Sequence, residues 1–241
     1  MSGGTQAWAP RRFWTAARVV EAPGGFAVTL DARPLRTPAK APVLLPARAL
    51  ADAVAAEWDA QEGVVRPAAM PLTRAVNSAI DTVGPRRAEV VAEVARFAET
   101  DLLCYRAAGP AALGARQAMA WDPLLGWAAA TFGARLVTVE GVMFAPQPAA
   151  ALSALRAGVE RFDAFELTAL HDLVALSGSL VIGLAAAAGQ APAETLWDKA
   201  HVDEAWQAEQ WGEDAEAAAA LALRRQAFLQ AMRLLALVRA G

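Results

Sequence analysis

The chain has 241 residues, of which 56% are hydrophobic, so it is long enough for one large or two small domains with buried cores. Its net charge is −3 and it contains no basic block, which argues against a nucleic-acid partner. The single cysteine, Cys104, excludes an intramolecular disulfide and a cysteine-rich zinc site.

Two segments bear on targeting. The first twelve residues have no apolar run behind their charges, so they do not predict a secretory signal. Residues 173–189 are nearly uncharged, but they are fewer than the roughly 20 apolar residues that a membrane span needs. We expect a buried central helix there, in which Ser179 and Gly183 let another helix approach closely; a membrane-associated factor is the alternative. The expectation is a monomeric, cytoplasmic bacterial protein without integral membrane insertion.

A small antiparallel sheet is predicted near the start of the chain. The predicted elements are a strand over 12–21, a turn over 22–25, a strand over 26–31 and a short strand over 43–45. Phe26, Val28 and Leu30 alternate, so they should share the buried face. Three prolines between residues 34 and 42 cannot occupy a central ladder position, which predicts an edge strand or an extended arm there.

Helical patterns follow. They predict helices over 46–61, 71–83 and 86–99, one starting at Asp122-Pro123, and helices over 149–161, 164–188, 193–211 and 214–239, with a short extended segment over 136–144. Asp122 is expected to cap its helix, with Pro123 at the first helical position. Gly84-Pro85 marks the cleanest boundary. We therefore predict an α+β fold, with a sheet-bearing domain over 1–84 and an all-helical domain over 85–241.

Motifs for catalysis are not found in the sequence. Nucleophile-elbow, phosphate-loop and dinucleotide-loop patterns are missing, and the two histidines, His171 and His201, have no partner at metal-ligand spacing. Cys104 is expected to be a buried, inert thiol. The sequence thus predicts no catalytic, cofactor-binding or metal-binding residue, and a protein that is not an enzyme.

Residues 203–216 have the chemistry of a binding surface instead. They combine two tryptophans, six carboxylates and two glutamines on a helix that Gly212 should end. Trp206 and Trp211 each lie four residues from a glutamine, which places an aromatic ring beside an amide on each of two adjoining faces. Each tryptophan has two interpretations, partner contact or core packing, and the same holds for Trp58 in a second cluster over 57–61. A third cluster spans 70–81.

Several of these segments resemble, in order, the assembly chaperone family of the F-type ATP synthase alpha subunit. The matching residues are Arg12-Phe-Trp14, Gly25-Phe26, Leu30–Pro38, Glu57–Gln61, Met70–Arg74, Asn77, Asp81, Thr100–Arg106, Trp121–Leu124, Asp203-Glu204, Gln207 and Trp211-Gly212. They cover nearly the whole chain, and the ordered set is more specific than any single piece. Ala32 departs from the pattern, because a turn residue such as glycine or histidine is expected there.

The resemblance implies a two-domain, non-enzymatic chaperone without a nucleotide or metal. Such a protein binds the free alpha subunit, shields the surface that meets a beta subunit and promotes assembly of the catalytic head. With Trp211 as anchor and nearby carboxylates as partners for basic or amide groups, the expected partner-binding residues are Glu204, Gln207, Trp211, Gly212, Glu213 and Trp58. The alternatives are a helical scaffold for another client, or a small-molecule enzyme whose interdomain cleft is lined by Arg33, Arg36, Arg74 and Asp81.

Overall fold

The computed structural model describes residues 11–240. The chain divides into two compact units, one running to Thr82 and taking in the chain from Ala236, the other spanning Val83–Leu235. The first carries an antiparallel sheet with helices and the second is predominantly helical, which confirms the predicted α+β class. The domain boundary predicted at Gly84-Pro85 stays a prediction, and most of the segment assessed for a secretory signal lies outside the described residues.

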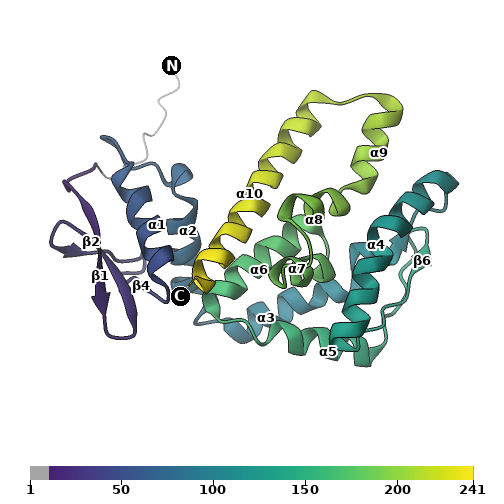
Figure 1. The fold of residues 1–241 in the computed structure, drawn as a ribbon, viewed down its shortest axis with the longest axis horizontal. Coiled ribbons are helices and arrows are strands. Elements are labelled where there is room, and N and C mark those ends of the chain that lie inside the picture. Colours follow the sequence, from purple (N-terminus) through teal and green to yellow (C-terminus); the bar gives the residue numbers. More distant parts are fainter. Residues whose placement is uncertain (1–10, 241) are drawn as a thin grey trace, which may run out of the picture. The chain divides into compact units, whose positions relative to one another are not determined.

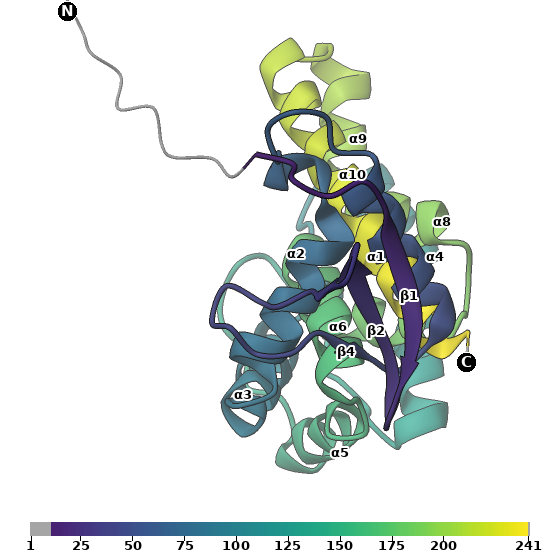
Figure 2. The same cartoon turned by 90° about the vertical axis from the view of Figure 1, so that its left-hand side faces the viewer.

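The sheet of the first unit is centred on one strand, β2. Strand β1 (Ala17–Ala22) pairs antiparallel with β2 (Gly25–Leu30), which also pairs antiparallel with β3 (Arg33–Pro34) and β4 (Leu44–Leu45). Helix α1 (Arg48–Asp59) packs on this sheet (Figure 2). Val28 and Leu30 are buried beneath it, and β3, with Pro34, is an edge strand as expected.

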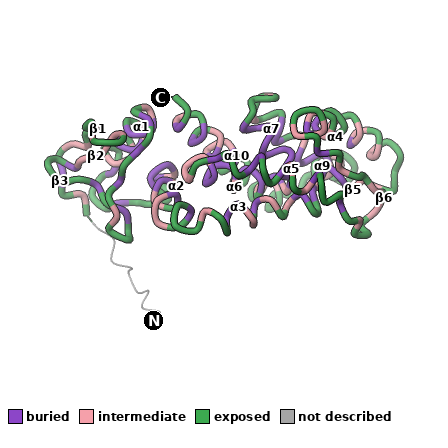
Figure 3. The backbone as a smooth tube through the Cα atoms, turned by 90° about the horizontal axis from the view of Figure 1, so that it is seen from below, coloured by how far each residue is buried: buried purple, intermediate pink, exposed green. Residues whose placement is uncertain are grey.

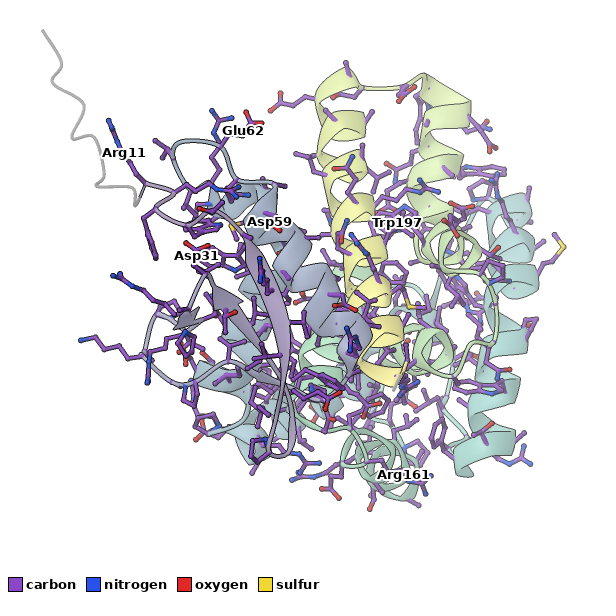
Figure 4. All side chains as sticks on the ribbon, turned by 60° about the vertical axis from the view of Figure 1, so that its left-hand side comes forward. Arg11, Asp31, Asp59, Glu62, Arg161 and Trp197 are labelled. Carbon is purple, nitrogen blue, oxygen red and sulfur yellow. The ribbon has the colours of Figure 1, made fainter. Side chains whose placement is uncertain are left out.

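The first strand begins later than predicted, because side chains occupy the backbone groups that precede it. The guanidinium of Arg12 donates to the carbonyls of Trp14, Thr15, Asp59 and Gln61. The carboxylate of Asp31 accepts the amides of Thr15 and Ala16, each at 3.0 Å. Asp31 and Asp59 lie near the same end of β1 (Figure 4). The residues before β1 are therefore fixed by side chains and not by a ladder.

Carboxylates also hold the helices of the first unit. After α1 come η1 (Pro67–Ala69), α2 (Pro71–Ser78) and a π-helical turn, η2 (Ala79–Val83). Glu57 accepts the amides of Leu72 and Thr73, both at 2.8 Å, so it caps the first turn of α2. Asp81 accepts the hydroxyl of Thr37 at 2.7 Å and the amide of Ala39 at 3.1 Å. Glu57 and Asp81, from the sequence clusters over 57–61 and 70–81, thus stabilise the fold.

The second unit surrounds one buried helix, α7. Its elements are α3 (Arg87–Arg96), η3 (Phe97–Thr100), η4 (Leu102–Cys104), β5 (Tyr105–Arg106), α4 (Ala111–Phe132), β6 (Val139–Glu140), α5 (Ala149–Val159), α6 (Ala164–Ser177), α7 (Leu180–Ala187), α8 (Ala193–Ala200), α9 (Val202–Trp211) and α10 (Ala215–Arg239) up to Leu235. Every residue of α7 is buried (Figure 3). In the described part of the chain, no helix has the length and apolarity needed to cross a membrane.

Several predictions for this unit need correction. The helix predicted over 164–188 ends at Gly178, which is left-handed with φ +71°, and restarts after Ser179, whose side chain caps α7. The helix predicted over 193–211 is interrupted at His201. The short extended segment contains β6, which pairs parallel with β5, so the unit is not entirely helical.

The helix start predicted at Asp122-Pro123 is wrong, because α4 runs straight through it. Asp122 does not cap; its carboxylate pairs with Arg106 at 2.7 Å. Burial of Trp121 and Leu124 on either side of the proline favours continuation of the helix. This packing offsets the hydrogen bond that Pro123 cannot donate.

Gly183 allows α6 and α7 to pack closely, although both were expected to form one helix that a different helix approaches. A Cβ atom there would overlap Cγ2 of Val174 and lie 3.4 Å from Cδ1 of Leu170. We expect Gly183→Ala to lower the free energy of unfolding by about 1–3 kcal/mol, because overpacking outweighs the better helix propensity of alanine. Gly126→Ala in α4 is the matched control, since its Cβ would meet nothing within 4 Å. Urea titration of both variants measures the difference, and equal stabilities would contradict the prediction.

Candidate functional site

Helices α9 and α10 form an antiparallel pair that is joined by three residues (Figure 1). Gly212 ends α9 with φ +88°, a conformation that favours glycine. Asp214 then starts α10, because its carboxylate accepts the amide of Ala217 at 2.8 Å. The predicted helix break is therefore a tight connection between two helices.

An open groove of about 1100 Å³ lies between the two helices. Its α9 wall contains Glu204, Ala205, Gln207, Ala208 and Trp211, and its α10 wall contains Ala217, Ala218, Ala220, Leu221 and Arg224. Residues of α4 and α8, among them Met119 and Thr195, complete it. Most of these side chains are small or apolar, and both walls remain largely exposed to solvent.

Aromatic packing fixes the base of the groove. The ring of Trp197 stacks on His201 with centroids 3.8 Å apart and lies 5.5 Å from the ring of Phe228. Trp197 lies between the ribbons of α9 and α10 (Figure 4). Helix α8 is also tied to α4, because the indole of Trp121 donates to the carbonyl of Lys199 at 2.6 Å. The two walls therefore rise from a rigid base.

Helix α9 is held to α4 by polar contacts. Arg116 pairs with Glu209 at 2.6 Å, and the hydrogen bond lowers the pKa of the Glu209 carboxyl. The buried side chain of Gln117 donates to Asp203 at 2.7 Å. Val202 is the one residue of α9 that is buried. Two acids of the 203–216 stretch thus position α9 and are not available to a partner.

Glu204 and Glu213 line the groove together with one tryptophan, whereas Asp214 caps α10 and Glu216 does not line the groove. Glu204 and Glu213 are exposed and have no hydrogen bond or ion pair to another side chain among residues 11–240. Trp211 is 78% exposed although its ring contributes to the groove wall. Trp206 is half-buried and is not part of that wall. An exposed tryptophan between two unpaired carboxylates suits a protein partner better than it suits a stable monomer surface.

The structure brings together five of the six residues expected to bind a partner. Glu204, Gln207, Trp211, Gly212 and Glu213 all line the groove. Trp58 lies in the other unit, where it is half-buried and packs edge-on against Trp14 with centroids 5.2 Å apart. Partner contact stays a prediction for all six residues.

The α10 wall is the part of the site that sequence reasoning missed. The sequence feature that could have indicated this wall is the alanine-rich start of α10. It has apolar residues on every side and hence no single buried face. A second missed feature is the loop after β6, where Val142, Met143 and Phe144 are all strongly exposed.

The cysteine and the two histidines, which were considered as catalytic or metal-binding residues, make structural contacts. Burial raises the pKa of the Cys104 thiol to about 12, so it stays protonated and unreactive at neutral pH. His171 bonds Asp172, whereas His201 is buried and bonds the carbonyl of Trp197. Within the described range, no three His, Cys, Asp or Glu residues are grouped so as to hold a metal ion.

An open, largely apolar groove with a carboxylate rim is typical of surfaces that bind another protein. Comparison with known proteins identifies the family: residues 11–129 match the model of the ATP12 chaperone protein. The crystal structure of Atp12 from Paracoccus denitrificans is 48% identical, with a TM-score of 0.92 over 95% of this chain and 98% of that chain, and a mutant of that protein matches equally well. Atu1473 from Agrobacterium tumefaciens, titled as a candidate chaperone, is 45% identical, with a TM-score of 0.91 over 95% and 87% of the two chains.

The chain belongs to the ATP12 chaperone family. It is a non-enzymatic chaperone for assembly of the ATP synthase alpha subunit, which confirms the predicted family and function. The enzyme alternative is therefore not retained. Asp81, one residue of its expected cleft, is instead engaged by Thr37 and Ala39.

Proposed function

We propose that the groove between α9 and α10 is where this chaperone binds the free alpha subunit, and that binding shields the surface that would otherwise meet a beta subunit. The observation that carries the proposal is the exposure of Trp211 on a groove wall whose base is rigid. An orphan subunit presents an apolar patch that aggregates unless it is covered. The chaperone acts in the bacterial cytoplasm as a monomer, and light scattering of the purified protein tests the monomeric state.

The composition of the groove suits reversible binding. One large aromatic ring supplies an anchor, and alanines supply shape without much apolar area. Glu204 and Glu213 stand at the rim, where charges steer association more than they add affinity. A beta subunit with a larger apolar interface would then displace the chaperone.

We expect Trp211→Ala to weaken binding of the alpha subunit by about 30-fold or more, mainly through faster dissociation, because hot-spot tryptophans contribute at least about 2 kcal/mol. Glu204→Lys should mainly slow association, and more so at low salt. Surface plasmon resonance and an aggregation assay of the alpha subunit measure both effects.

Leu223→Ala is the matched control, because Leu223 is 69% exposed on α10 but does not line the groove. It should protect the alpha subunit as well as the wild type does. If Trp211→Ala and Glu204→Lys are folded and protect equally well, the groove is not the binding site. Affinity capture from cells decides whether the client is free alpha subunit without stoichiometric beta, or another protein.

A further inference from the structure

The walls of the α9–α10 groove are helical, which restricts what can lie between them. The backbone groups of α9 and α10 are paired within each helix, so neither wall offers a sheet edge. An extended segment in this open groove would leave the amides and carbonyls that face the apolar walls without partners, at a cost for each group. A helix satisfies those groups internally and pays no such cost.

Small side chains on both walls leave room for large ones. Ala205 and Ala208 are three residues apart on α9, and Ala217 and Ala220 are three apart on α10, so each pair lies on one face of its helix. Alanine stripes that face each other without meeting form a receptor for the bulky side chains of a third helix. Trp211 and Leu221 add larger apolar groups to the same walls.

The length of the α9 wall sets the length of its occupant. The 10 residues of α9 span nine rises of about 1.5 Å, so this wall is roughly 14 Å long. A helix that lies along the wall contacts it over about nine residues, or about two and a half turns.

The carboxylates at the rim of the groove indicate which charges the bound segment should carry near its ends. Glu204 lies in the first turn of α9 and Glu213 follows its last turn, so unpaired carboxylates stand near both ends of the wall. Of the cations that line the groove, Arg116 is paired with Glu209, whereas Lys199 and Arg224 donate to the carbonyls of Ala120 and Leu176, each at 2.9 Å. Lysine or arginine on either side of an apolar stretch would complement this rim.

We infer that the groove takes an amphipathic α-helix of the alpha subunit, about nine residues long, with large apolar side chains toward α9 and α10 and basic residues near its ends. The inference rests on the proposed function and deepens it, because it states the conformation and chemistry of the segment that is bound. Recognition is then of the helix-in-groove type.

Site-specific photo-crosslinking tests the inference. A photoreactive phenylalanine analogue replaces Ala208 or Ala218 on the two walls, and Ala222, exposed on α10 and outside the groove, serves as the control position. Each protein is irradiated with full-length free alpha subunit, and mass spectrometry locates the linked residues. We expect both wall positions to link to one helical segment of the alpha subunit, at residues three or four apart, and the control position to give no such link.

The possible outcomes separate the inference from the proposed function. Links to a strand or loop of the alpha subunit would overturn the helical occupant and leave the groove as the binding site. A stable complex without links from either wall, or links to a second copy of the chaperone, would overturn both proposals. As a second measurement, Ala208→Trp should fill the groove and weaken binding by about ten-fold or more, whereas Ala222→Trp should not change it.

Discussion

Asp101→Ala should lower the free energy of unfolding by about 4 kcal/mol near pH 4.5 and by about half as much at pH 7. The Asp101 carboxyl is fully buried and accepts the amides of Leu103 at 3.1 Å and Val181 at 3.0 Å. It therefore ties the turn before β5 to the first turn of α7, the buried centre of the second unit. Removing it leaves two buried amides without partners, and each costs about 1–3 kcal/mol. Urea titration at both pH values measures the loss.

The pH dependence follows from the raised pKa of this carboxyl. Burial raises the pKa of Asp101 from 3.8 to about 6, so between these values the folded protein binds more protons than the unfolded chain. Stability from this group is thus greatest below the unfolded pKa and falls as pH rises toward 6, by about 3 kcal/mol in total. Asp101→Asn does not titrate, so the wild-type advantage over it should shrink by most of that amount, about 2 kcal/mol, from pH 4 to pH 7. A constant difference would show that the buried carboxyl has an ordinary pKa.

The same residue explains why the sequence predicted one helix where the structure has two. Residues 173–188 are free of charge and residues 164–188 contain no proline, so a local pattern predicts a continuous helix. The break at Gly178 is stabilised by Asp101, which is distant in sequence and accepts the buried amide of Val181 in the first turn of α7. Local propensity cannot indicate a partner supplied from another part of the chain.

Strand pairing in the first unit was predictable because its signals are local in the sequence. The turn at Pro23-Gly-Gly25 and the alternation along β2 are local signals, and the register pairs Ala22 with Gly25. The start of β1 was misplaced because Asp31 and Arg12 supply side-chain partners to the preceding backbone. Hydrophobic periodicity does not indicate such contacts between a side chain and the backbone.

For the candidate site, the sequence predicted one wall and missed the other. Residues 203–214 carry tryptophan, carboxylates and a helix break, and such chemistry can be recognised without coordinates. The start of α10 is mainly alanine, a residue that is equally common in cores and on helix surfaces, so its exposure depends on what packs against it. The structure shows that nothing in the described chain fills the space between the two helices.

Phe228→Ala should destabilise the second unit by about 3–5 kcal/mol, because a fully buried aromatic ring is replaced by a cavity. Phe228 is the first buried residue of α10, and upstream of it the helix is mostly exposed. Its ring lies 5.5 Å from that of Trp197, which in turn stacks on His201 at the start of α9. Thermal and urea unfolding measure the loss of stability.

Loss of the Phe228 ring should also make the walls of the groove more mobile, because both walls pack on this aromatic base. Hydrogen exchange should become faster in the amides of residues 215–227 and of α9, and affinity for the alpha subunit should fall because the walls are less well organised before binding. Leu223→Ala, on an exposed position of the same helix, should change stability by no more than about 0.5 kcal/mol. If Phe228→Ala loses stability but keeps wild-type affinity and exchange in α9, the base does not organise the groove. The two walls would then be positioned chiefly by the contacts of α9 with α4, through Arg116 and Gln117.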